Sequence, residues 1–201
     1  MPPYEPRTPK IPGLRQGFSN GSIQPPSSGE LPMKWYLIPA VALITMPALQ
    51  AQESPNVAAV RALYEMNKGV VIKTAEQVGE DLYGFKPTPE VRALGQLLGH
   101  VANANFMFCS TALGEKSPNA TDYEKAATKA EIVKGIKEGF AYCDKAFQMS
   151  DAQAAEAATV FGSKQNRLYA LVFNVAHNNE HYGNLVTYMR LKGMTPPSSQ
   201  R

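Results

Sequence analysis

The sequence predicts an all-α protein in the form of a four-helix bundle. Four segments carry apolar residues at three- and four-residue steps, the spacing of one helix face, and no alternating apolar run between them is long enough to form a convincing strand. The 201 residues are 44% hydrophobic and 18% charged, as in an ordinary globular protein. Because helices joined by modest loops bury such stripes against one another, we expect one bundle domain over residues 52–197, followed by a short tail over residues 198–201.

The first two helices are predicted from apolar periodicity and from their end signals. Apolar residues recur at helical spacing over residues 57–77, so the first helix is expected there. Thr88 is the expected N-cap of the second helix, with Pro89 at the first helical position, and both residue types are typical of a helix start. This helix is expected over residues 89–113, because Gly114 is typical of the position just beyond a helix end.

The third and fourth helices are predicted in the same way. The third is expected over residues 122–149 and has one apolar face. Its members are Ile132, Val133, Ile136, Phe140, Cys143 and Phe147. The fourth is expected over residues 164–192, because Gly193 and then Pro196 follow it.

Two segments precede the predicted bundle. Residues 1–32 are rich in Pro, Ser and Gly without apolar periodicity, and are expected to be disordered or an overlong gene start. Residues 33–51 combine one positive charge, a short apolar run and a small residue, Ala51, before the expected cleavage point, which is the layout of a secretory signal peptide. The alternative is a membrane anchor, which needs about 20 apolar residues, whereas this run is shorter and is interrupted by Pro39 and Pro47. We therefore expect an exported protein, periplasmic or secreted, without a stable membrane anchor.

The charge pattern argues against a nucleic-acid partner. The whole chain has 20 basic and 17 acidic residues. Four of the basic and two of the acidic residues precede residue 52, so the remainder has 16 and 15 and a net charge of about +1. It has no basic cluster interleaved with aromatic residues, and nucleic-acid binding is not expected.

The three histidines of the chain are the main chemical lead. His177 and His181 are four residues apart in a predicted helix, a spacing that puts both imidazoles on one helix face, and His100 lies in another predicted helix. Three neutral imidazoles are enough to hold Zn²⁺ with the fourth position left to water or substrate. The alternative is that each histidine is a hydrogen-bonded core residue, because helical spacing alone produces many such pairs.

Residues between the paired histidines limit the chemistry. A zinc protease of the His-Glu-x-x-His type needs Glu directly after the first His, and Asn178 stands there. Glu180 is either an acceptor for an imidazole or, as we favour, a solvated charge. Five asparagines are candidates to orient the imidazoles, with plain surface positions as the alternative: Asn103, Asn105, Asn174, Asn178 and Asn184.

The two cysteines that follow the predicted leader, Cys109 and Cys143, leave two interpretations open. An oxidising compartment would allow them to form a disulfide if their Cα atoms lie within about 7 Å. They are otherwise two small buried hydrophobic residues that never meet.

Separate motifs in a fixed order add a resemblance to a known family. They are YGFKPTPEVR at 83–92, LLGHVA at 97–102, HNNEHYGNLVTY at 177–188 and GMTPP at 193–197. On these motifs, residues 57–197 resemble the DinB family (damage-inducible, YfiT-like) of bacterial four-helix bundles. The resemblance implies an up-down-down-up topology, a homodimer and a divalent metal ion, usually zinc or nickel, held by three histidines that map onto His100, His177 and His181.

The same resemblance bears on the cysteines and on activity. In the implied topology the second and third helices are parallel, so their carboxyl ends meet, and a disulfide between Cys109 and Cys143 is predicted as a hypothesis. Enzymatic members of the family use thiols of the cytoplasm, whereas this chain has the signals of export. The expected function is therefore a three-histidine metal-binding protein that is a metal-dependent hydrolase or transferase of an unknown small molecule, with a non-catalytic exported metal-binding or stress-associated bundle as the alternative.

Overall fold

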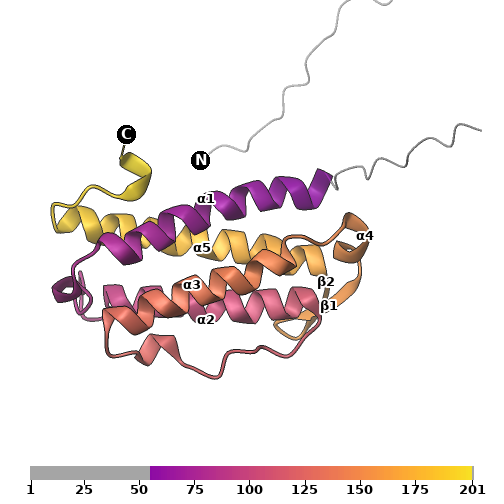
Figure 1. The fold of residues 1–201 in the computed structure, drawn as a ribbon, viewed down its shortest axis with the longest axis horizontal. Coiled ribbons are helices and arrows are strands. Elements are labelled where there is room, and N and C mark those ends of the chain that lie inside the picture. The colour runs from indigo at the N-terminus through magenta and orange to yellow at the C-terminus, as the bar shows by residue number, and fades with distance from the viewer. Residues whose placement is uncertain (1–54, 201) are drawn as a thin grey trace, which may run out of the picture. The chain divides into compact units, whose positions relative to one another are not determined.

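The computed structural model describes residues 55–200 of the protein (Figure 1). The expectations for residues 1–32 and for a signal peptide at residues 33–51 lie outside the described residues. Within residues 55–200, no helix is both long and apolar enough to cross a membrane.

Four long helices make up the bundle, as predicted: α1 Pro55–Gln77, α2 Leu94–Leu113, α3 Lys129–Ala146 and α5 Arg167–Leu191. In Figure 1, α2 and α3 run in one direction and α1 and α5 in the opposite one. Side-chain contacts agree, because the start of α1 reaches the end of α3, where Arg61 Nε donates to the carbonyl of Phe147 over 2.6 Å. The helices therefore have the up-down-down-up arrangement.

The core lies between the inward faces of these helices. Its largest fully buried side chains include Tyr64, Phe140, Phe147, Leu98, Ile136, Leu171, Leu185 and Met189. The ring of Tyr64 stacks on that of Phe147 with 3.9 Å between centroids, and the Tyr64 hydroxyl donates to Asp144 over 2.7 Å. Burial of each large aliphatic or aromatic side chain stabilises the fold by roughly 1.5–3 kcal/mol, so this layer is what holds α1, α3 and α5 together.

A disulfide joins α2 to α3 inside this core. It links Cys109 to Cys143, whose Cα atoms are 5.2 Å apart and whose side chains are fully buried. The parallel course of the two helices brings these two positions to the same level of the bundle.

The start of α2 was predicted wrongly. Thr88 and Pro89 lie in a region of bends and turns, and the helix begins only at Leu94. The preceding loop supplies the acceptors that the first helical amides need: Leu94 N–H donates to the carbonyl of Phe85 over 2.9 Å, and Gly95 N–H donates to that of Tyr83 over 2.8 Å. Tertiary hydrogen bonds therefore replace the local cap that the sequence indicated.

The third helix also begins later and ends earlier than predicted. Asp122 caps a short 3₁₀ helix, η2 Tyr123–Lys125, by accepting from Glu124 N–H. Thr128 is the true N-cap of α3, in a reciprocal arrangement with Glu131, and α3 ends at Ala146 before a short helix, α4 Asp151–Ala154.

A β-hairpin precedes α5, although the sequence predicts no strand there. Its second strand takes the place of the predicted start of the fourth helix. Strands β1 Ala157–Val160 and β2 Ser163–Asn166 pair antiparallel, and Lys164 lies in β2. Phe161 and Gly162 make the two-residue turn with φ of 49° and 76°, the left-handed values that such hairpins require. The strands are short and β2 is fully exposed, so no apolar alternation reveals them in the sequence.

The chain after α5 folds back on the bundle through a 3₁₀ helix, η3 Pro197–Ser199. Ser198 N–H donates to the hydroxyl of Tyr182, and Gln200 Nε2 donates to Gln77 Oε1, each over 2.9 Å. The described part of the expected tail thus contacts both α5 and α1.

Candidate metal centre

The structure brings the three histidines together from two helices. His100 comes from α2, and His177 and His181 lie one turn apart on α5, which runs antiparallel to α2. His177 Nε2 lies 3.2 Å from His100 Nε2 and 3.0 Å from His181 Nε2. The potential ligand atoms of all three residues lie within 4.8 Å of one another, and in the described part of the chain no other such group of three or more His, Cys, Asp or Glu residues occurs.

These distances fit a single tetrahedral ion. With Zn–N bonds of roughly 2.0–2.1 Å, two nitrogen ligands of one zinc ion stand about 3.3 Å apart. The separations of 3.0 and 3.2 Å are close to that value. The donor set is also chemically suitable, because imidazole nitrogen is a preferred ligand of zinc, nickel and copper.

Burial keeps the two α5 histidines neutral. It lowers the pKa of His177 from 6.5 to about 4, with help from neighbouring His181 and His100, which would repel a second positive charge. It lowers the pKa of His181 as well, again with a contribution from His100. Neutral imidazole is the form that binds a metal ion, so both side chains are ready to do so at neutral pH.

The remaining ring nitrogens differ in their surroundings. His100 Nδ1 lies 3.0 Å from Glu124 Oε2, and the other oxygen of Glu124 accepts from Arg92 Nε over 2.6 Å. Burial alone would raise the pKa of Glu124, but hydrogen bonds and charges from Arg92 and His100 outweigh it and the pKa is lowered. By contrast, His177 Nδ1 and His181 Nδ1 are buried and have no hydrogen-bond partner.

Glu124 is the site residue that the sequence did not reveal. Sequence reasoning put it inside the third helix, 24 residues from His100, with no spacing rule to connect the two. The acidic residue that sequence reasoning did consider, Glu180, is exposed on α5, in agreement with its interpretation as a solvated charge.

The asparagines divide into two groups. Asn105, Asn174 and Asn178 are fully buried, and Asn105 Oδ1 accepts from the amides of the other two over 2.8 and 2.9 Å. Asn103 instead bonds the segment that connects α2 to α3, residues 114–128, which is called the crossover below. Asn184 is exposed. A buried amide cluster therefore links α2 and α5 close to the histidines.

Aromatic side chains border His177. The ring of Phe108 meets His177 edge-on with 5.5 Å between centroids, and Phe173 and Phe161 continue the cluster. Phe161, at the tip of the hairpin, is 66% exposed.

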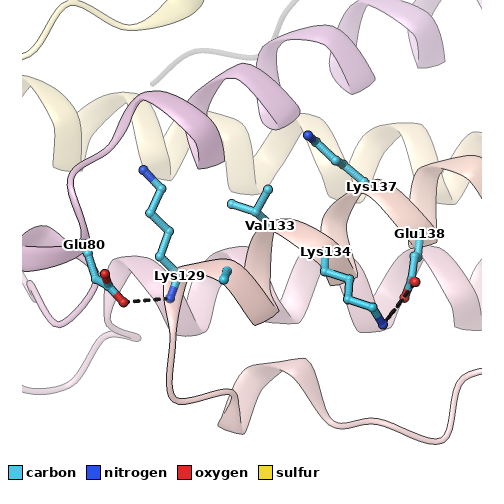
Figure 2. Close-up of a pocket in the computed structure, with 7 residues that line it drawn as sticks. Glu80, Lys129, Val133, Lys134, Lys137 and Glu138 are labelled. Atoms are coloured by element: carbon cyan, nitrogen blue, oxygen red, sulfur yellow. Dashed lines mark hydrogen bonds and ion pairs between the residues drawn. The ribbon is translucent and has the colours of Figure 1, made fainter.

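A second feature, a surface groove beside α3, contains none of the histidines. It has a volume of about 630 Å³ and is lined by Glu80 and by residues of α3 (Figure 2). Its charged groups are bonded to one another or to neighbouring groups: Lys134 pairs with Glu138 at 3.1 Å, and Lys137 pairs with Glu76 at 2.7 Å. Because its lysines and glutamates are bonded in this way and its described lining contains no metal-ligating cluster, the groove is not the candidate site.

A family model for the DinB superfamily matches residues 41–185. The chain belongs to the DinB superfamily. The matched part of this DinB superfamily member contains all three histidines, and it begins inside the segment expected to be a signal peptide.

Two solved structures share the fold of this DinB superfamily member. A DinB-like protein from Bacillus cereus ATCC 10987 is 18% identical, with 70% of this chain and 95% of that chain covered and a TM-score of 0.62. A DinB-like protein from Bacillus subtilis is 22% identical, with 71% and 99% covered and a TM-score of 0.54. Comparison with curated proteins gives no match.

Proposed function

We propose that this DinB superfamily member binds one divalent metal ion, zinc or nickel, through His100, His177 and His181. The observation that supports this most directly is the convergence of three Nε2 atoms from two helices. Burial of imidazoles without a metal would leave polar nitrogen atoms facing one another in a poorly solvated place, which is unfavourable. A bound cation would turn the same arrangement into a favourable one.

The metal centre is proposed to have one open position. Among the described residues, no carboxylate or thiol joins the three histidines as a fourth ligand. A metal ion held by three imidazoles acts as a Lewis acid and lowers the pKa of a bound water toward about 7. On this basis the function is a metal-dependent hydrolase or transferase that acts on a small molecule.

Metal binding without catalysis is the second candidate. It is favoured by the state of Glu124, the carboxylate that contacts His100, because both of its oxygens are already bonded, to Arg92 and to His100. A general base must be able to reach a substrate proton, and Glu124 is held elsewhere. Hydrolysis of model esters and phosphoesters by the metal-loaded protein separates the two candidates.

Metal content is the test of the proposed site. The full chain is expressed without an affinity tag, and inductively coupled plasma mass spectrometry measures the bound metal beside a His177→Ala/His181→Ala variant. We expect close to one equivalent of zinc or nickel in the parent protein and almost none in the variant. Circular dichroism checks that the variant is still helical, and an equal metal content in both proteins would refute the site.

Export is the second part of the proposal. It is supported by the signal-like segment 33–51 and by the buried disulfide, since disulfides persist in oxidising compartments. Mass spectrometry of the mature protein from periplasm and medium is expected to find a chain that begins at Gln52. An unprocessed chain in the cytoplasm would contradict export.

A further inference from the structure

The crossover between α2 and α3 places one carboxylate against one ligand of the proposed metal centre. We propose that Glu124 is a positioning residue: it holds His100 in the form that carries its proton on Nδ1, so that Nε2 is left to bind the metal ion, and Arg92 holds Glu124 in place. This inference rests on the proposed metal site and adds the residues that determine how one of its ligands is oriented.

Two glycines let the crossover come close enough. A Cβ at Gly99, the residue before His100, would overlap the carbonyl group of Tyr123 and lie 2.8 Å from Cα of Glu124. A Cβ at Gly135 on α3 would overlap the ring of Tyr123. Because both positions lack a side chain, the backbone of the crossover lies directly on α2, next to His100.

Hydrogen bonds then fix the crossover at this place. Tyr123 N–H donates to Asn103 Oδ1 over 3.1 Å, and the Tyr123 hydroxyl donates to Glu138 Oε2 over 2.9 Å. Asn103 also donates to Asp122 over 2.8 Å, and Asp122 caps the turn that contains Glu124. The residue before Glu124 is therefore tied to both α2 and α3.

The chemistry of the contact determines where the proton lies. An ionised carboxylate can only accept hydrogen bonds, so at 3.0 Å from Glu124 Oε2 the proton must be on His100 Nδ1. In the neutral ring, the form that binds a metal ion, Nε2 then has a lone pair, and this atom faces His177 Nε2 at 3.2 Å. The other tautomer would direct a hydrogen atom at the place of the metal ion.

Arg92 completes the arrangement. Its Nε donates to Glu124 Oε1 over 2.6 Å, and its own carbonyl accepts from the Tyr188 hydroxyl over 2.9 Å. The Arg92–Glu124 pair is partly solvated, with 45% and 29% of the side chains exposed, so it contributes little to stability. The pair instead fixes the orientation of the Glu124 carboxylate: Oε1 faces Arg92, and Oε2 is directed at His100.

Among the three proposed ligands, only His100 is oriented by a carboxylate. The Nδ1 atoms of His177 and His181 have no hydrogen-bond partner, so neither ring is oriented by a carboxylate. Loss of Glu124 should therefore change one ligand and leave the other two as they are.

The test combines zinc affinity with a direct view of the proton. Zinc affinity is measured by competition with a chelator for the parent protein and for Glu124→Ala, Glu124→Gln and Glu180→Gln. Glu180→Gln is the matched control. Glu180 is an exposed carboxylate next to His181 in sequence, and its change to Gln removes the same negative charge as Glu124→Gln. We expect a loss of about 10- to 100-fold for Glu124→Ala, a smaller loss for Glu124→Gln, whose amide oxygen can still accept, and little change for the control.

Long-range ¹H–¹⁵N spectra of the zinc-free protein report the tautomer of His100. The parent protein is expected to carry the proton on Nδ1, and Glu124→Ala to lose this preference. Equal zinc affinity in Glu124→Ala and the parent, or a parent His100 with its proton on Nε2, would overturn the inference. If the parent protein binds no metal but shows the Nδ1 proton and its loss in Glu124→Ala, the proposed function fails while the orienting role of Glu124 stands.

Discussion

At the scale of single residues, the buried and unpartnered nitrogen of His177 determines which protonation state the folded protein favours. His177 has a buried Nδ1 without a partner and an Nε2 that faces two other imidazoles, so its neutral form is strongly preferred. That preference favours metal binding and also makes the free energy of unfolding depend on pH, because the unfolded chain takes up a proton where the folded chain does not.

The metal-free protein should therefore lose stability on acidification. The pKa of His177 is about 4 in the folded state against 6.5 for an ordinary histidine. Between these values the unfolded state binds the extra proton, so the free energy of unfolding should fall as the pH drops from about 6.5 to about 4. Urea unfolding at pH 7.5 and pH 5 measures this fall. His177→Ala is expected to show a smaller fall, and an equal fall in both proteins would contradict the assignment.

At the scale of elements, close packing of the crossover on α2 depends on Gly99. Gly99→Ala should destabilise the protein by about 1–3 kcal/mol, because the added methyl group overlaps the carbonyl of Tyr123 and the crossover must shift. Gly69→Ala in α1 is the matched control, because nothing lies within 4 Å of its added Cβ, and it should stabilise the helix by about 0.5–1 kcal/mol. Chemical unfolding of both variants measures the difference. Equal effects would show that the crossover does not lie against α2.

The pairing of α2 with α3 makes a second prediction at this scale. Removal of the Cys109–Cys143 bond by a double change to Ser should destabilise the protein by about 2–5 kcal/mol, because a disulfide restricts the unfolded chain. Thiol titration of unreduced, denatured protein should find no free thiol. Two free thiols per chain would rule out the disulfide.

The elements also show how far the sequence leads. Apolar periodicity located the bodies of all four helices and the ends of α1 and α2, because these depend on local spacing and on Gly114. It misplaced the start of α2, since this start depends on a distant partner, the carbonyl of Phe85. The start of α3 is local, because Thr128 and Glu131 cap it reciprocally, but the prediction placed the start at Asp122, which caps the separate 3₁₀ helix η2. The hairpin was not predicted, because its two strands are short and carry no apolar alternation, and only the turn at Phe161 and Gly162 marks it.

For the molecule as a whole, the site links helices that are far apart in the sequence. The three histidines could be proposed from spacing and from family motifs, whereas Glu124 could not, because its contact with His100 exists only once the crossover is folded. Metal binding should thus stabilise the entire bundle, since an ion that binds only the folded state shifts the unfolding equilibrium.

Thermal unfolding tests this global effect. The melting temperature should rise when zinc is added to the metal-free protein, and the rise should grow with zinc concentration as mass action requires. His177→Ala/His181→Ala should show no zinc-dependent change above that caused by non-specific binding. A rise of the same size in this variant would place the stabilising ion elsewhere.

X-ray absorption fine structure at the zinc edge of the zinc-loaded protein tests the three-histidine centre most directly. We predict three imidazole nitrogens at roughly 2.0–2.1 Å and one further light ligand, the signature of an open site. A sulfur ligand, or fewer than three imidazoles around the metal, would contradict a centre built from His100, His177 and His181.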